Sequence, residues 1–208
     1  MSSYAQYLTP LIALQAISFA SISAAFRAAL DSEQGINRRF GSMPIAPATP
    51  LAARMSASLY RCSIGLTTAI LCGHVIGFRF YGGPARTAGF CVLVLTIGAT
   101  LSFLADVIGT GSRNAEATTQ WLALPQLIFG MLSIGIQPAE RFPHWLQPVV
   151  RNQPISQFVY AMRALAGDSA PDAGTVNWPT IGPSLLWIVG AILTTAILSV
   201  FVLGRRPR

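Results

Sequence analysis

Few residues in this chain could do chemistry, and most of them lie within apolar stretches. His74 and Asp106 could carry a proton there, and Gln15 and Ser21 could line a polar path. Polar side chains at membrane depth are functional candidates by default. We favour a structural role for each of them. The His74 imidazole would donate to a nearby carbonyl, Gln15 and Ser21 would form hydrogen bonds between helices, and Asp106 would form an ion pair with Arg113.

The residue types that the chain lacks exclude several enzyme sites. All 14 basic residues are Arg, so a GxxxxGK[ST] phosphate loop and a Schiff-base lysine cannot exist. The two His residues are far apart, so no HExxH motif occurs, and we assign no catalytic residue and no metal site. Cys62, Cys72 and Cys91 lie in or beside apolar runs, which is typical of buried structural thiols. Uphill transport would need energy from a partner or an ion gradient.

The composition is that of a membrane protein. Hydrophobic residues make up 52% of the chain and charged residues only 10%, whereas a soluble domain has about 25% charged residues. The net charge of +7 comes from Arg residues that are scattered along the chain and flank apolar runs. We therefore attribute this charge to membrane topology and predict no nucleic-acid partner.

Five apolar runs could cross a bilayer as helices. They cover residues 8–26, 62–78 with a flank from 55, 87–105 with an extension to 108, 119–136, and 178–203. Gly73 and Gly77 in the second run have GxxxG spacing, a weak signal for helix contact. We predict an all-α, polytopic membrane protein with about five transmembrane helices, which form a single domain over residues 1–208.

A charged segment, residues 27–54, separates the first two runs and is rich in Arg. Arginine between two membrane-length runs indicates the cytoplasmic side. The C-terminal sequence GRRPR is also basic, so we predict a cytoplasmic C-terminus. An odd number of spans then places the N-terminus outside.

The segment 137–177 is too polar to span a membrane and too apolar for a free loop. Trp145 and several prolines suit a membrane interface. Apolar residues then recur at three- and four-residue spacing, namely Ile155, Phe158, Val159, Met162 and Leu165. This pattern predicts an amphipathic helix, interfacial or re-entrant, in the outer leaflet, with Gly167 as its C-terminal stop.

Two stretches resemble the permease subunits of ABC-2 exporters, specifically the daunorubicin/doxorubicin-resistance (DrrB-type) family. NRRFGSMPIAPATPLAAR, residues 37–54, is similar to the family's cytoplasmic coupling segment. SIGIQPAERFPHWLQPVVRNQPISQFVYAMRALAG, residues 133–167, is similar to its two short outer helices before the last span. Family members have six spans, so we expect that this sequence lacks the first, through a late start assignment or a shortened gene product.

The resemblance implies an ABC exporter in the bacterial cell membrane. A separate ATPase subunit would bind ATP and Mg²⁺, a second permease subunit would complete the assembly, and this chain would hold no cofactor. The cargo would be an amphiphilic drug or lipid. The residues implied in coupling to the ATPase are Asp31, Glu33, Arg38 and Arg39 as charged contacts, and Met43 and Pro44 at the turn.

Two other functions compete with this one. The chain could be a shortened permease relative that is inactive or regulatory. It could also be a membrane-embedded enzyme that acts on lipids through His74, Asp106 and His144. The segment 27–54 could then be an ordinary solvated loop.

Overall fold

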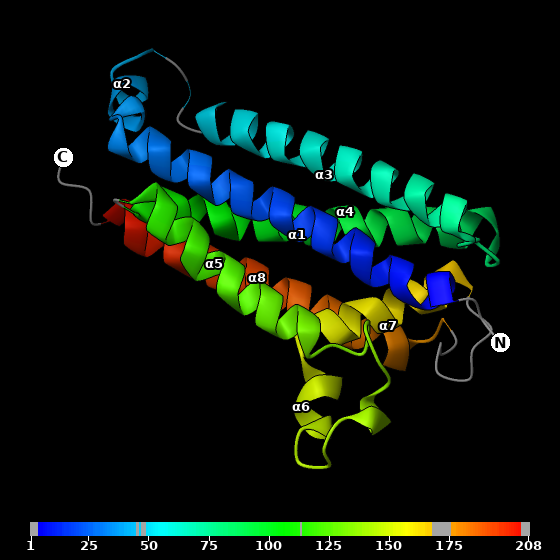
Figure 1. The fold of residues 1–208 in the computed structure, drawn as a ribbon. Helices are drawn as coiled ribbons and strands as arrows, with labels where there is room; N and C mark the ends of the chain where they lie inside the picture. Colours follow the sequence, from blue (N-terminus) through cyan, green and yellow to red (C-terminus); the bar gives the residue numbers. More distant parts are fainter. Residues whose placement is uncertain (1–3, 45, 47–48, 113, 168–175, 205–208) are drawn as a thin grey trace.

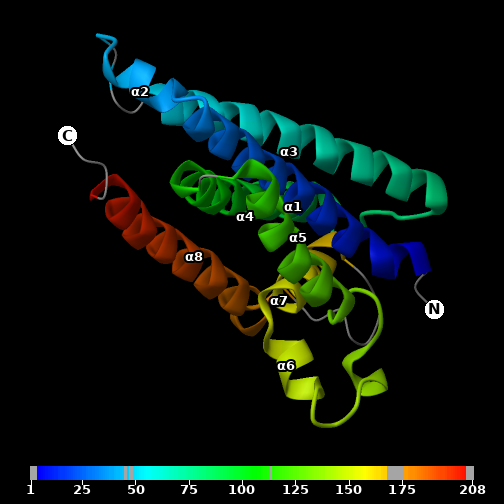
Figure 2. The same ribbon diagram turned by 60° about the vertical axis from the view of Figure 1, so that its left-hand side comes forward.

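The described part of the chain is a bundle of long helices. The computed structural model describes residues 4–44, 46, 49–112, 114–167 and 176–204, with side chains for all of these except 38, 41 and 202–204. The elements are α1 (Tyr4–Glu33), α2 (Ile36–Gly41), α3 (Thr49–Ile76), α4 (Gly83–Gly111), α5 (Ala115–Met131), η1 (Ala139–Arg141), α6 (Gln147–Asn152), α7 (Pro154–Ala166) and α8 (Trp178–Gly204). Figures 1 and 2 show α2 at one end of the bundle and α6 and α7 at the other. We call these the α2 end and the α7 end.

Four helices are long and apolar enough to cross a membrane. They are α1, α3, α4 and the Trp178–Phe201 part of α8. Helix α5 has 17 residues and is shorter than these. The all-α membrane fold is therefore confirmed, and the predicted count of five spans is approximate. The spans in α3 and α8 are only 22% and 17% buried within the chain, so most of their apolar surface is free to contact lipid or another subunit.

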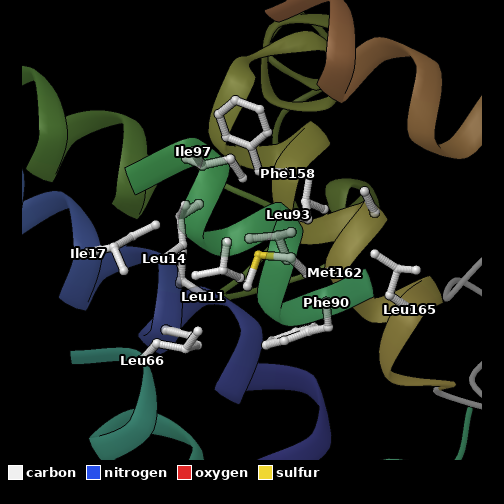
Figure 3. Packing of buried hydrophobic residues seen from close by; sticks show 14 of the residues in the cluster. Leu11, Leu14, Ile17, Leu66, Phe90, Leu93, Ile97, Phe158, Met162 and Leu165 are labelled. Carbon is white, nitrogen blue, oxygen red and sulfur yellow. The ribbon is translucent and has the colours of Figure 1, made fainter. Parts of the chain in front are cut away.

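The core lies where α1, α4 and α7 meet. Figure 3 shows side chains from these helices, with one from α3, pointing toward one another. Leu14 and Ile17 of α1, Phe90 and Ile97 of α4, and Met162 of α7 are almost completely buried. The amphipathic helix predicted at 154–166 is thus confirmed, but its apolar face packs against protein instead of entering lipid.

Small residues allow α1 and α4 to approach closely. A Cβ atom added to Gly98 would lie 3.6 Å from the Cβ of Ile17, and one added to Gly109 would overlap the carbonyl oxygen of Ala25. Within a bilayer the hydrophobic effect does not drive helices together, because the lipid tails are as apolar as the side chains. Close backbone contact instead supplies van der Waals attraction between the helices. The backbones of these two helices are therefore in direct contact at Gly109.

Two glycines lie directly after helix ends, and the sequence analysis predicted one of these ends. Gly167 has a φ of 75° and caps α7, which confirms it as a stop signal. Gly77 has a φ of 111° and lies just beyond α3, which ends at Ile76. The expected helix contact is therefore confirmed only for Gly73, which lies within α3 and faces Thr9 of α1, because Gly77 lies beyond the end of the helix.

Candidate coupling site

Four helices meet around one arginine at the α2 end. Arg54, in the second turn of α3, has its Nε 2.9 Å from Oδ1 of Asp106 in α4. Its NH1 lies 3.7 Å from Oδ2 of Asp31 in α1 and donates to Oδ1 of Asn37 in α2 over 3.1 Å. A single guanidinium thus connects the loop helix α2 with the three helices around it.

Further hydrogen bonds extend this contact. Asn37 Nδ2 donates to Ser32 Oγ over 3.1 Å, and Ser32 Oγ donates to the carbonyl of Thr110 in α4 over 3.0 Å. We call Asp31, Ser32, Asn37, Arg54 and Asp106 the Arg54 cluster. Its members come from four helices, so a displacement of α2 reaches α1, α3 and α4 through direct contacts.

The ion pair at the centre of the Arg54 cluster is only partly hydrogen-bonded. The Asp106 side chain is 6% exposed and that of Arg54 is 23% exposed. The Nε–H of Arg54 makes no hydrogen bond of good geometry, although the nitrogen is 2.9 Å from the carboxylate. The attraction between opposite charges depends little on the direction of the N–H, so the 2.9 Å distance makes this contact an ion pair.

The structure divides the predicted coupling residues into two groups. Asp31 is held by Arg54, and Glu33 Oε1 accepts a 2.7 Å hydrogen bond from the backbone N–H of Ala115, where α5 begins. Arg39, Met43 and Pro44 are exposed at the α2 end. The side chain of Arg38 lies outside the described residues. Asp31 and Glu33 thus have contacts within the bundle, although Glu33 is also exposed, and Arg39, Met43 and Pro44 are exposed beside them.

Asp106 has a partner that the sequence analysis did not name. Arg54 lies against it, whereas the predicted partner, Arg113, lies outside the described residues. Helix α4 continues to Gly111, so Asp106 lies inside it and faces α3 instead of the following turn.

The other polar candidates do not converge on one path. Gln15 accepts a 2.7 Å hydrogen bond from Gln126 of α5, and Ser21 lies 3.1 Å from Ser102 of α4. His74 Nδ1 is 3.1 Å from the carbonyl of Ile70 on its own helix, in agreement with the structural alternative. Each of these side chains therefore has a local partner.

The three residues of the suggested lipid-modifying enzyme are also dispersed. His74 follows Arg54, the partner of Asp106, by 20 residues on the same helix (74 − 54), which corresponds to about 30 Å. His144 is exposed and lies between η1 and α6. In the described residues, no three His, Cys, Asp or Glu side chains lie close enough together to hold a metal ion. The geometry supports no such enzyme.

A second polar site at the α7 end was missed by the sequence analysis. Arg163 of α7 is 3% exposed, and its guanidinium lies 3.5 Å above the centre of the Tyr7 ring. It donates to the carbonyl oxygens of Tyr7 and Ile134, at 2.9 and 3.1 Å through NH2. The only signal for this site in the sequence is the arginine that directly follows Met162 on the amphipathic helix.

A cavity lies beside Arg163. Its volume is about 460 Å³, and Tyr160, Gln157, Pro179 and Pro183 are among its lining residues. An exposed ion pair between Arg151 and Glu140, 2.8 Å long, also borders it. The α7 end thus combines a fixed buried cation with a solvent-accessible cavity.

Comparison with known proteins identifies relatives of the whole chain. A sequence profile described as ABC-2 family transporter protein matches residues 1–201. The doxorubicin resistance ABC transporter permease protein DrrB of Mycobacterium tuberculosis is 55% identical over 206 residues, which are 99% of this chain and 71% of that protein.

Two further relatives are more distant. The probable doxorubicin resistance permease DrrC of Mycobacterium tuberculosis is 27% identical, over 91% of this chain and 66% of that protein. The daunorubicin resistance permease DrrB1 of Streptomyces coeruleorubidus is 26% identical, over 80% of this chain and 59% of that protein. No solved structure matches the chain significantly.

Proposed function

The chain belongs to the ABC-2 family of transporters, and on that basis we propose that it is the membrane-spanning permease subunit of an exporter. A separate ATPase binds ATP and Mg²⁺ and supplies the energy, and a second permease subunit completes the pathway. Two observations support this division of labour. The relatives are named as permeases, and a chain without lysine cannot build the phosphate loop of such an ATPase.

The α2 end faces the cytoplasm in this proposal. Arg39 and Arg54 belong to the arginine-rich segment that the positive-inside rule assigns to that side. The exposed group at this end, Arg39, Met43 and Pro44, forms the contact with the ATPase. The basic C-terminus of this multi-pass protein lies on the same side.

The Arg54 cluster is the observation that carries the coupling mechanism. Binding of ATP closes the ATPase pair, and this displaces α2. Because Arg54 contacts Asn37 of α2 and Asp106 of α4, the displacement changes the relative stability of two packings of the helices. A ligand shifts such an equilibrium only by its differential affinity for the two states, so the closed ATPase must favour the outward-open packing.

The cargo is an amphiphilic drug or lipid that enters from the bilayer. Helices α3 and α8 expose apolar faces, which include Leu71, Val75, Leu186 and Val200. Gln15 and Ser21, the polar candidates within the spans, are paired within the bundle. Contact with lipid-like molecules along these faces suits a substrate that partitions into the membrane.

Reversal of charge at α2 tests the coupling contact. The variant carries Arg38→Glu with Arg39→Glu, and the control carries Arg141→Glu, an exposed arginine of η1 at the α7 end. Affinity-tagged protein is purified from its host, and co-purified ATPase is quantified by mass spectrometry. We expect at least a tenfold loss of ATPase from the double variant and none from the control, with equal thermal unfolding temperatures.

Two results separate the competing functions. Undiminished ATPase recovery with the double variant would contradict the coupling contact. Recovery of the ATPase without any stimulation of its hydrolysis by amphiphilic drugs or lipids would instead indicate the regulatory permease relative.

A further inference from the structure

One strip of α1 is exposed between the two helices that flank it. Figures 1 and 2 show α1 between α3 and α5. A Cβ added to Gly65 of α3 would lie 3.6 Å from the Cβ of Ala16, and Gln15 contacts α5 on the other side. Ile12 and Phe19 lie three or four residues from both Gln15 and Ala16, so they face outward between these contacts. They are 43% and 48% exposed, and we call Ile12, Gln15 and Phe19 the α1 strip.

The glutamine pair at this strip uses only part of its hydrogen-bonding capacity. Gln126 Nε2 of α5 donates to Gln15 Oε1 over 2.7 Å, and a Cβ added to Gly130 would overlap the Gln15 amide, so the amide lies against α5. Among the described residues, Nε2 of Gln15 and Oε1 of Gln126 have no hydrogen-bond partner, and neither atom is completely buried. The pair therefore offers one donor group and one acceptor to a neighbour.

Lipid cannot satisfy these two groups. Gln15 lies near the middle of the apolar run of residues 8–26, where hydrocarbon supplies no hydrogen-bond partner. The exposed hydroxyls of Thr67 on α3 and Thr194 on α8 differ, because they donate to carbonyls of their own helices. Those two faces suit contact with lipid. The face that carries Gln15 and Gln126 instead suits contact with another protein, since polar side chains hold membrane helices together.

We propose that the α1 strip and Gln126 form the contact between two copies of this chain, related by a two-fold axis beside the glutamine pair. This inference rests on the proposed function, in which a second permease subunit completes the pathway, and it identifies that subunit as a second copy. A two-fold contact makes every bond twice. Gln15 Nε2 donates to Oε1 of the partner subunit's Gln126, and the symmetry-related bond closes a ring of four amides.

A second copy fits this surface because the surface is complementary to itself. The unused group of one glutamine is a donor and that of the other is an acceptor, so two identical chains satisfy both groups at once. Phe19 and Ile12 lie beside the amides and become buried against the partner. A central aromatic side chain with polar bonds around it is typical of residues that dominate binding at an interface.

Cross-linking in lipid vesicles tests the contact without an ATPase or a cargo. The three native cysteines are first replaced by alanine. A single cysteine is then introduced as Phe19→Cys or, for the control, as Val189→Cys on α8, where the native side chain is 52% exposed. A short bifunctional thiol reagent is added to the vesicles. We expect cross-linked dimers from Phe19→Cys and none from Val189→Cys.

Loss of the glutamine amide should weaken the dimer. Gln126→Leu removes both bonds between the subunits, and at the average strength of such bonds the dissociation constant should rise about sevenfold. Energy transfer between fluorescently labelled chains, measured as lipid is added, gives this constant. Ser21→Ala is the matched control, because it removes a buried contact of α1 with Ser102 of α4 and should leave the constant unchanged. Gln126→Met replaces the Leu variant if that fails to fold.

Three results would overturn this inference. They are the absence of dimers from Phe19→Cys, equal cross-linking of Val189→Cys, and a Gln126→Leu dimer that is no weaker than the Ser21→Ala dimer. The proposed function has a separate measurement, the recovery of the ATPase with the tagged chain. A chain that recovers the ATPase but does not dimerise would refute this contact and leave the exporter subunit in place. Dimers without any recovered ATPase would support the contact and contradict the coupling.

Discussion

The two ends of the bundle each have an arginine with several contacts, and these contacts differ in kind. Arg54 is partly exposed, whereas Arg163 is buried. At the α2 end, Arg54 contacts the carboxylates of Asp106 and Asp31. At the α7 end, Arg163 donates to backbone carbonyls and stacks on the Tyr7 ring. Attraction between charges tolerates changes of angle, whereas hydrogen bonds to carbonyls hold one orientation. The contacts of Arg54 with carboxylates therefore depend less on orientation than those of Arg163 with carbonyls.

Removal of the fixed arginine should have the largest effect on folding. Arg163→Met leaves the carbonyls of Tyr7 and Ile134 without this donor and removes the contact with the ring. Hydrogen bonds from a charged donor contribute about 1.5–3 kcal/mol each, and the Ile134 carbonyl keeps the Tyr7 hydroxyl as a second donor. The free energy of unfolding should therefore fall by about 4 kcal/mol. Thermal unfolding in detergent measures the change.

The matched control is Arg151→Met on the same face. Arg151 pairs with Glu140, and both side chains are more than half exposed. Its removal should cost less than about 1 kcal/mol. If Arg163→Met and Arg151→Met lowered the free energy of unfolding equally, the stability of the α7 end would not depend specifically on Arg163.

The ion pair at the α2 end should matter more for transport than for folding. Asp106→Asn removes one charge from a buried contact, which by itself costs about 3–5 kcal/mol. Arg54 keeps Asp31 and Asn37 as partners and is partly exposed, so we expect about 2 kcal/mol. Substrate-stimulated hydrolysis by the assembled transporter should fall by at least tenfold.

Glu116→Gln is the control for the α2 end. Glu116 is an exposed carboxylate in the first turn of α5 and should be nearly neutral in both assays. If Asp106→Asn supports normal stimulated hydrolysis, the ion pair is structural and the distinction between the two ends fails.

The smallest effect on the free energy of unfolding is expected from a substitution in the middle of the bundle. Gln126→Leu removes the hydrogen bond to Gln15 that connects α5 with α1. Such bonds between membrane helices contribute about 0.6 kcal/mol on average. Gln120→Leu, on the exposed side of the same helix, provides the baseline for thermal unfolding. If Gln126→Leu lowered the free energy of unfolding by more than about 2 kcal/mol, the middle of the bundle would hold a further contact that is important for stability.

The helices were predictable because each signal is local. Apolar runs of membrane length gave α1, α3, α4 and α8, since hydropathy within one segment decides whether that segment can be buried in lipid. Gly167 was recognised as the end of α7 because its conformation depends on its own missing Cβ. The helix ends were less well predicted, and α1 continues beyond Phe26 to Glu33.

The contacts of the candidate site were not predictable in the same way. Asp106 was recognised as exceptional, but its partner Arg54 lies 52 residues earlier in the chain (106 − 54) and only meets it when α3 packs on α4. The contacts of Asp31 with Arg54 and of Glu33 with the N–H of Ala115 were not predictable, because a charge that also pairs within the bundle looks like any other charge in a sequence. Arg163 was overlooked since its partners are backbone carbonyls, which carry no residue signature.

The close contact of α1 with α4 limits how the protein can open. Gly109 leaves no room for a Cβ beside the carbonyl of Ala25, so the backbones of α1 and α4 touch there and sliding of one helix on the other would cause steric overlap. We therefore expect a gate along α3, α5 or α8 instead of between α1 and α4. We expect that a disulfide engineered between α1 and α4 leaves turnover intact, whereas one that locks α8 to α4 arrests it.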